Sequence, residues 1–144
     1  MPDVMPQPGA TSSDLTDDPI RLLIADDIQS TREELRDALS REGFDVVGYA
    51  EDGVEAYHTT CWLRPEVVLM DLRMPGMHGI DATTLIKAQV PRTQVVILTA
   101  FSDPDTKWSA EMSGAASYLD KDTPLDVLVD TLRNAALAYR TWTG

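Results

Sequence analysis

The strongest constraint on the fold is a regular alternation of short apolar runs with longer amphipathic segments. Five largely apolar runs of five to seven residues lie between Ile20 and Asp120, and a segment with helical periodicity follows each of them. Short, nearly continuous apolar runs are typical of strands that are buried on both faces, as in parallel sheets. The alternation therefore predicts an α/β domain with a parallel sheet and helices on both of its faces.

The boundaries of these segments follow from the apolar pattern. The expected strands span residues 20–25, 44–50, 66–70, 94–100 and 116–120, and the expected helices span residues 30–42, 52–63, 80–88, 103–113 and 123–141. Ser30 and Glu33 have the spacing of a capping box at the start of the first helix. Thr123 is expected to cap the last helix, with Pro124 in its first turn.

Composition limits the remaining organisation and the kinds of partner. Residues 1–19 contain prolines, small polar residues and acids but no Lys or Arg, which favours a disordered leader before one domain over residues 20–141. The net charge of −12 argues against binding nucleic acid or an anionic membrane through the bulk surface. No apolar run approaches the ~20 residues that cross a bilayer, and no secretory signal is evident. We therefore expect a cytoplasmic protein without membrane contact.

Polar side chains stand at the carboxyl ends of the expected strands. Asp26 and Asp27 follow the first strand, Asp71 follows the third, Thr99 lies at the end of the fourth, and Lys121 follows the fifth. In a sheet of order 2-1-3-4-5 the first and third strands are central neighbours, and ligands bind outside the carboxyl ends where the order reverses. Each residue alone is explained more simply as a cap, a turn former or a solvated side chain. Their convergence on one edge favours a shared site.

The residue types at this edge suit a divalent cation and phosphoryl transfer. Two like charges about 4 Å apart repel by roughly 4 kcal/mol at an effective dielectric constant of 20, so the three acids must hold protons, stay solvated or bind a cation. Oxygen ligands at a solvent-facing site suit Mg²⁺, and the chain has no Cys/His cluster to indicate another metal. A carboxylate can also act as a nucleophile and carry an acyl phosphate, with a lysine charge and a hydroxyl group beside it.

Four segments resemble the CheY-like receiver domain of two-component response regulators. The resemblance covers residues 20 to 140 and is carried by "LLIADD", "VVLMDLRMPGMHGID", "VVILTA" and "GAASYLDKDTPLDVL". It implies a flavodoxin-like (βα)5 three-layer sandwich with a five-stranded parallel sheet. The pieces "MDLRMPGM" and "KDTP" are most similar to the subfamily with a C-terminal LuxR/NarL-type helix-turn-helix output domain.

The resemblance also implies roles for the residues at the sheet edge. Asp71 would accept a phosphoryl group from a sensor histidine kinase. Asp27, Asp71 and the backbone carbonyl of Arg73 would bind Mg²⁺ directly, and Asp26 would orient its water shell. The domain would not be an enzyme in the usual sense, because it would only phosphorylate itself and lose its own phosphoryl group.

A second group of residues would carry the signal after phosphorylation. Thr99 and Lys121 would contact the phosphoryl oxygens, and Tyr118 would change rotamer when Thr99 moves. The resemblance implies transcription regulation through a DNA-binding domain that this chain does not contain. Because the sequence ends shortly after the last helix, we favour a truncated chain over a stand-alone receiver. We also expect a homodimer on phosphorylation, a partner for which the sequence itself carries no pattern.

Two other functions remain open from the sequence. A pseudo-receiver would keep the fold as an interaction module and never take a phosphate, although the full set of site residues argues against it. An Asp-nucleophile phosphatase would need a second acid two residues after Asp71, and that position is occupied by Arg73.

Overall fold

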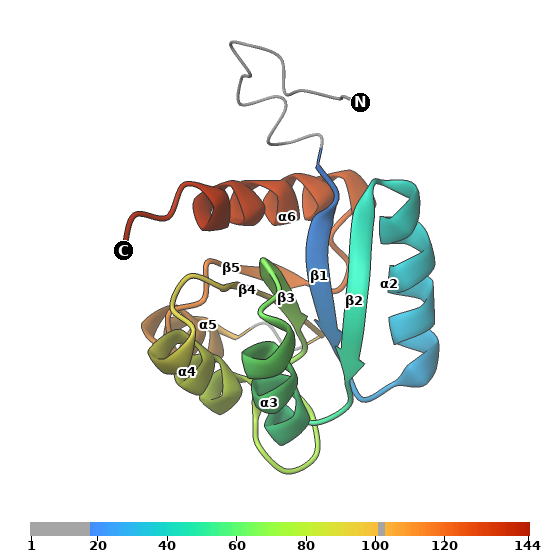
Figure 1. Ribbon diagram of the computed structural model, residues 1–144. Coiled ribbons are helices and arrows are strands. Elements are labelled where there is room, and N and C mark those ends of the chain that lie inside the picture. Colours follow the sequence, from blue (N-terminus) through green and yellow to red (C-terminus); the bar gives the residue numbers. More distant parts are fainter. Residues whose placement is uncertain (1–17, 101–102) are drawn as a thin grey trace, which may run out of the picture.

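A computed structural model describes residues 18–100 and 103–144, and it contains one five-stranded parallel sheet of order β2-β1-β3-β4-β5 (Figure 1). The strands are β1 (Ile20–Ala25), β2 (Phe44–Ala50), β3 (Val67–Met70), β4 (Gln94–Thr99) and β5 (Ser117–Asp120). All five expected strands and the expected strand order are confirmed. The disordered leader was expected over residues 1–19, and residues 1–17 lie outside the described part of the chain.

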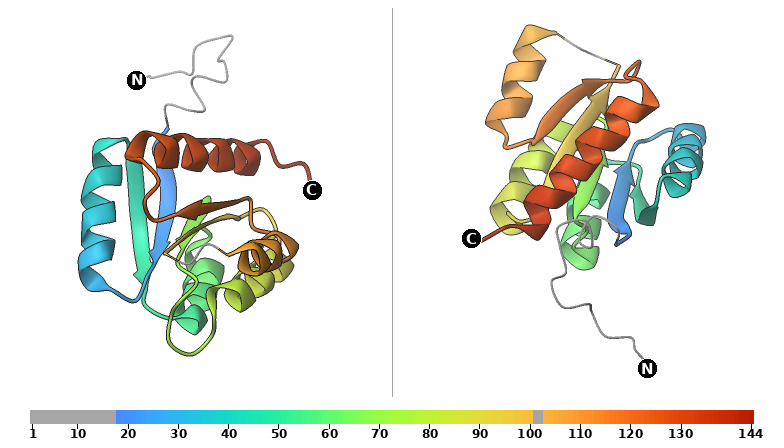
Figure 2. Two further views of the ribbon diagram at one scale, coloured as in Figure 1. Left: turned by 180° about the vertical axis from the view of Figure 1, so that it is seen from behind. Right: turned by 90° about the horizontal axis from the view of Figure 1, so that it is seen from above.

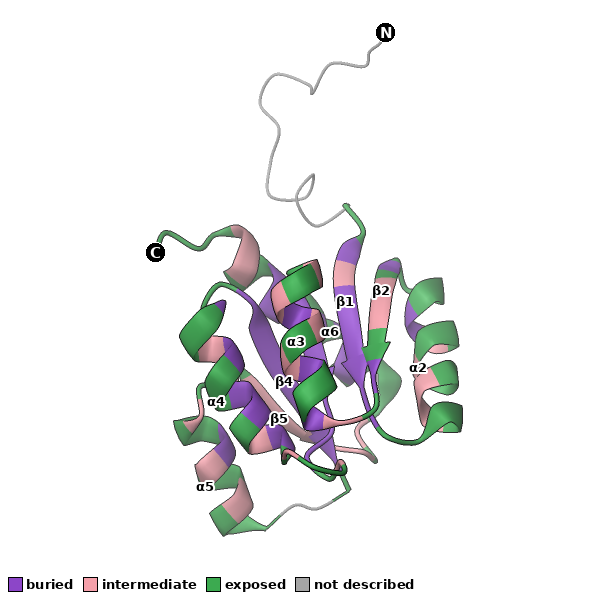
Figure 3. Ribbon diagram, turned by 60° about the horizontal axis from the view of Figure 1, so that its bottom comes forward, coloured by how far each residue is buried: buried purple, intermediate pink, exposed green. Residues whose placement is uncertain are grey.

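Helices cover both faces of the sheet, as Figures 1 and 2 show. One face carries α2 (Gln29–Arg41) and α6 (Leu125–Arg140), and the other carries α3 (Gly53–Leu63), α4 (Gly79–Gln89) and α5 (Pro104–Met112). In β1, Leu22 and Ile24 belong to the first core and Leu23 to the second, because successive strand residues point to opposite faces. The central strands are therefore buried on both sides, whereas the helices expose their outer faces (Figure 3).

Parallel strands bring their carboxyl ends to one edge of the sheet. The backbone N–H of Asp26 donates to the carbonyl of Ala50 at the end of β2 (2.9 Å), and the N–H of Asp71 donates to the carbonyl of Ala25 at the end of β1 (2.8 Å). The hydrogen-bond ladder thus continues one residue past the strands. It holds the two aspartates in adjacent positions, and it explains why an apolar strand ends at a carboxylate.

The two expected helix caps are wrong. Helix α2 begins at Gln29 with Ile28 as its N-cap and no capping side chain, so Ser30 lies inside the helix. The Asp26 carboxylate accepts from the N–H of Ile28 (2.9 Å) and already shapes this turn. Helix α6 begins at Leu125 with Pro124 as its N-cap and no capping side chain, and Thr123 belongs to the preceding turn, where its N–H donates to the carbonyl of Asp120 (2.9 Å).

A partly buried ion pair fastens the end of α6 to the amino-terminal edge of the sheet. The guanidinium of Arg140 contacts both carboxylate oxygens of Glu66, with distances of 2.5 Å and 3.1 Å. The same carboxylate accepts from the backbone N–H of Arg21 (3.0 Å). The side chains of Arg140 and Glu66 are only 12% and 8% exposed. No sequence pattern pointed to this pair, which is separated by 74 positions in the chain.

One buried hydroxyl lacks a partner and provides a stability test. Among the described residues, the hydroxyl of Thr60 in α3 is buried without a hydrogen bond. Thr60→Val is expected to raise the free energy of unfolding by up to about 1 kcal/mol, since it removes an unsatisfied polar group at constant shape. In Thr83→Val the same change removes a hydrogen bond from the buried Thr83 hydroxyl to the Gly79 carbonyl (2.8 Å) and should destabilise. Equal losses in urea unfolding of both variants would contradict the expectation.

Candidate functional site

Asp26 is held in place by four separate contacts at the carboxyl edge of the sheet. Its backbone N–H is bound by β2, and its carboxylate accepts from Ile28 through Oδ1 and from the Lys121 ammonium through Oδ2 (2.9 Å). Its carbonyl accepts a hydrogen bond from Arg32 (2.7 Å). The residue is only 2% exposed, so its carboxylate has a single defined position.

Asp26, Asp27 and Asp71 form the acid cluster that the sequence predicts. Each offers a carboxylate oxygen within 4.8 Å of the other two. Asp26 and Asp71 are buried, whereas Asp27 is exposed at the rim. Three carboxylates with one side open to solvent are the ligand type that Mg²⁺ prefers, because this ion keeps part of its water shell. The residues present therefore fit a magnesium ion.

Lys121 connects this cluster to the ends of β4 and β5. Its ammonium lies 2.9 Å from Asp26 Oδ2 and 3.4 Å from Asp71 Oδ2. Its backbone N–H donates to the carbonyl of Thr99 (2.9 Å), which ties the end of β5 to the end of β4. Burial disfavours the charged ammonium, but the hydrogen bond to Asp26 and the charges of both carboxylates outweigh burial and raise the pKa of Lys121.

The surroundings of Asp71 disfavour the charged form of its carboxyl group. Burial raises the pKa of Asp71 above its ordinary value, and the charge of Asp26 raises it further. The Lys121 ammonium and a hydrogen bond from the Arg73 backbone oppose this rise without cancelling it. The pairing therefore stabilises the charged form of Lys121. The charged form of Asp71 remains disfavoured, because Asp71 is the more buried partner and has a second acid beside it.

The remaining residues expected in the site lie around the cluster. Thr99 is fully buried at the last position of β4, and Tyr118 in β5 packs partly buried against the core on the face that α3, α4 and α5 cover. Arg73 lies exposed in the loop between β3 and α4, two residues after Asp71. The topology thus brings all seven expected residues to one edge of the sheet or next to it.

Two glycines that the sequence analysis did not single out hold the loop after Asp71. A methyl group at Gly79 would collide with the carbonyl oxygen of Asp71 and lie 2.8 Å from the Cα of Leu72. A methyl group at Gly53, the first residue of α3, would collide with the carbonyl of Met77 in the same loop. The loop is therefore packed directly against the first turns of α3 and α4. The spacing "MHGID" shows Gly79 but gives no sign of this contact.

Gly79→Ala is expected to lower the free energy of unfolding by about 1 to 3 kcal/mol, because the added methyl group meets backbone that cannot move aside. Thr84→Ala, at an exposed position of the same helix, should change stability by less than about 0.5 kcal/mol. Urea unfolding followed by circular dichroism would measure both. A Gly79→Ala variant as stable as Thr84→Ala would show that the loop is not tightly packed.

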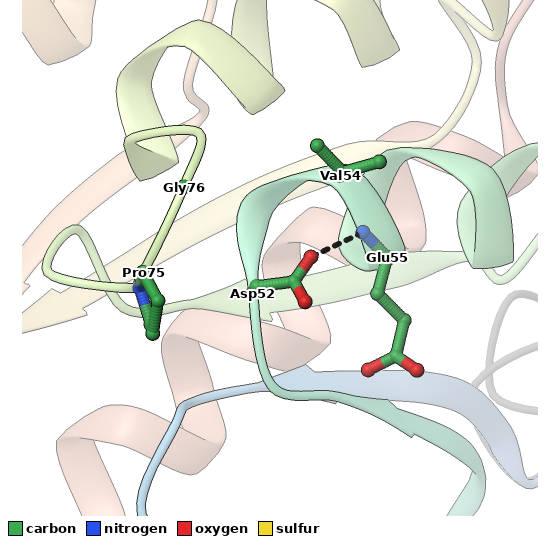
Figure 4. A pocket seen from close by; sticks show the side chains of 5 residues that line it. All are labelled: Asp52, Val54, Glu55, Pro75 and Gly76. Atoms are coloured by element: carbon green, nitrogen blue, oxygen red, sulfur yellow. Dashed lines mark hydrogen bonds between the residues drawn. The ribbon is translucent and has the colours of Figure 1, made fainter.

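A shallow pocket is lined by none of the seven residues expected in the site. The pocket of about 360 Å³ lies between the start of α3 and the loop after β3, and Figure 4 shows its lining by Asp52, Val54, Glu55, Pro75 and Gly76. The carboxylate of Asp52 is engaged as the N-cap of α3, where it accepts from the N–H of Glu55 (2.8 Å). The Asp52 carboxylate in this lining is therefore occupied as a helix cap.

Comparison with known proteins shows the family of the chain. The family model for the response regulator receiver domain matches residues 22–133. The chain is 40% identical over 111 residues to the transcriptional regulatory protein LnrK of Bacillus subtilis, covering 76% of this chain and 50% of LnrK. It is 38% identical over 126 residues to PdtaR of Mycobacterium tuberculosis, covering 88% of this chain and 61% of PdtaR. The chain thus spans between half and about three fifths of these relatives.

Solved structures give the same result. The signal receiver domain of a NarL response regulator from Mycobacterium tuberculosis matches with a TM-score of 0.79 and 32% identity, covering 83% of this chain and 98% of that one. A LuxR-family two-component response regulator from Aurantimonas sp. matches with a TM-score of 0.79 and 30% identity, covering 83% and 86%. Among the described residues, no helix is long and apolar enough to span a membrane. The chain belongs to the response regulator receiver domain family and is a receiver domain of the two-component signalling system.

Proposed function

We propose that Asp71 is the phosphoacceptor of this domain and that a sensor histidine kinase is its phosphoryl donor. The observation that carries the proposal is the Lys121 ammonium, which bridges the buried Asp71 and Asp26 at the open edge of the sheet. An ammonium in this place can pair with a phosphoryl group as readily as with a carboxylate.

The proposed reaction is a direct displacement at phosphorus. A carboxylate oxygen of Asp71 attacks the phosphorus atom of a phosphohistidine, so that an O–P bond forms and the P–N bond breaks. The histidine leaves with the electron pair of that bond and takes up a proton. No separate base is needed, because the attacking group is already a carboxylate.

Asp26, Asp27, Asp71 and the backbone carbonyl of Arg73 are the groups that would hold Mg²⁺. When bound, this ion neutralises charge on the transferring phosphoryl oxygens. The Lys121 ammonium lies within 3.4 Å of both Asp26 and Asp71, so it would need only a small movement to turn from Asp26 toward the new phosphoryl group on Asp71.

The signal would pass from the modified aspartate to the surface of the domain. A phosphoryl group adds roughly −1.5 to −2 charges, and Thr99 and Lys121 can contact it only in the modified state. Tyr118, which lies opposite Ile97 in the β4–β5 register, would adjust its rotamer when Thr99 moves and alter the surface of α5, β5 and α6. A difference in contacts of this kind is what shifts a two-state equilibrium.

The output is proposed from the relatives. LnrK and PdtaR are named transcriptional regulatory proteins, and both extend well beyond the part that this chain matches. We infer that the domain regulates transcription in the cytoplasm through a DNA-binding domain of the longer protein, with a homodimer as the active form. The domain itself acts only on its own Asp71, by self-catalysed phosphorylation and dephosphorylation.

Intact-protein mass spectrometry after incubation with a small acyl phosphate tests the proposal. The wild-type chain should gain one phosphoryl group with Mg²⁺ and none with a chelator, and peptide mapping should place it on Asp71. A chain that folds and binds Mg²⁺ but gains nothing would favour the pseudo-receiver. Continuous release of inorganic phosphate from unrelated phosphomonoesters would favour the phosphatase.

A further inference from the structure

Arg32 in α2 contacts the backbone of the acid cluster and has no role in the proposed function above. Its guanidinium Nη1 donates to the backbone carbonyl of Asp26 at 2.7 Å. Its side chain is only 14% exposed, so the guanidinium is held close to the turn between β1 and α2. The contact involves the backbone of the turn and leaves the Asp26 carboxylate free for Ile28 and Lys121.

The hydrogen bond fixes the peptide unit that joins Asp26 to Asp27. A carbonyl oxygen defines the plane of its peptide, because the peptide bond is rigid. The orientation of this plane, together with the φ angle of Asp27, sets the direction in which the Asp27 side chain leaves the backbone. Asp27 is the exposed member of the cluster, so burial does not hold its carboxylate in place.

Glu51, whose side chain is 67% exposed, adds a weaker contact to Arg32. The second guanidinium nitrogen, Nη2, lies 3.9 Å from the carboxylate of Glu51, directly after β2. The backbone N–H of Glu51 donates to the Glu55 carboxylate (2.7 Å), which anchors Glu51 at the start of α3. Arg32 thus links α2, the end of β1 and the end of β2 around the Asp26–Asp27 turn.

We propose that Arg32 is a positioning residue of the magnesium site, which keeps the Asp27 carboxylate within ligand distance of Asp71 by fixing the Asp26–Asp27 peptide. The inference rests on the proposed magnesium-binding role of the cluster. Replacement of groups that orient metal ligands typically weakens metal affinity about 10- to 100-fold. The charge of Arg32 acts in the opposite direction, since a cation near the cluster repels Mg²⁺. The sign of the effect therefore separates positioning from electrostatics.

Mg²⁺ titration of the unphosphorylated chain by isothermal calorimetry tests the inference. Arg32→Gln removes the guanidinium and should weaken Mg²⁺ binding about 10-fold. Arg32→Lys keeps a donor for the Asp26 carbonyl but loses the reach to Glu51, so its affinity should lie between that of Arg32→Gln and wild type. Arg36→Gln, one turn further along α2, is the matched control. The Arg36 side chain is more exposed and pairs with Asp37. The Arg36→Gln variant should therefore bind Mg²⁺ with the affinity of wild type.

The outcomes distinguish this inference from the proposed function. Tighter Mg²⁺ binding by Arg32→Gln, with Arg32→Lys unchanged, would show a purely electrostatic role and overturn the inference. A lower melting temperature at unchanged Mg²⁺ affinity would show a purely structural role and also overturn it. If wild type binds Mg²⁺ and Arg32→Gln binds it equally well, the inference fails and the proposed function stands. If wild type binds no Mg²⁺, the magnesium-binding proposal fails and the inference with it.

Discussion

Asp71→Asn is expected to reduce phosphorylation from about one phosphoryl group per chain to none, the largest functional effect that we predict. The amide nitrogen and oxygen of asparagine cannot form the acyl phosphate, whereas the neighbouring Asp26 has its two carboxylate oxygens engaged by Ile28 and Lys121. Intact-protein mass spectrometry with a small acyl phosphate and Mg²⁺ measures the change. Asp45→Asn, at an exposed position in β2, should be phosphorylated as wild type is.

The same variant should reveal the raised pKa of Asp71 through stability. A carboxyl group whose pKa is higher in the folded than in the unfolded state destabilises the fold at pH values above the folded pKa. This penalty is lost as the pH falls through the folded pKa towards the unfolded one. Asp71→Asn should therefore be more stable than wild type at pH 7, and the difference should shrink on acidification. A difference that grows as the pH falls would mean that pairing with Lys121 outweighs burial.

Arg140→Met is expected to lower the free energy of unfolding by about 3 to 5 kcal/mol, the largest loss of stability foreseen here. The substitution removes the guanidinium from a Glu66 side chain that is 8% exposed, and among the described residues only the N–H of Arg21 still donates to its carboxylate. Methionine replaces much of the packing of the arginine side chain. The expected loss therefore comes mainly from the buried Glu66 charge, which is left without its partner. Urea unfolding at pH 7 measures the change.

Arg133→Met, in the same helix, is the matched control for this prediction. Arg133 lies 4.0 Å from Glu42, and the two side chains are 47% and 41% exposed. Exposed ion pairs typically contribute between 0 and about 1 kcal/mol. Glu66→Gln combined with Arg140→Met should recover part of the loss, because the buried charge is then absent. If Arg140→Met and Arg133→Met lower the free energy of unfolding by the same amount, burial of the Glu66 charge is not the cause of the loss.

The sheet and the acid cluster could be predicted because both follow from local patterns. Runs such as "VVLM" and "VVILT" have no polar face, so only a sheet covered on both sides accommodates them. Once β1 and β3 are neighbours, the residues that follow them must meet. The proximity of Asp26 and Asp71 is therefore a consequence of topology, and it needed no information on side-chain packing.

The features that the sequence did not reveal depend on packing between distant segments. Ser30 and Glu33 match a local capping pattern, but the Asp26 side chain reaches into the turn and the helix begins earlier. Glu66 and Arg140 are paired only because α6 crosses back over the sheet (Figure 1). Gly79 is required by one backbone atom of Asp71, a contact that has no signature in composition or periodicity.

The attachment of α6 also determines where the polypeptide enters and leaves the domain. Besides binding Glu66, the guanidinium of Arg140 donates to the carbonyls of Asp18 and Pro19, each at 3.2 Å, immediately before β1. The two boundaries of the fold are thereby fastened side by side, at the opposite edge of the sheet from the acid cluster. Boundaries this close are compatible with circular permutation, because a short linker could join them while new termini open elsewhere.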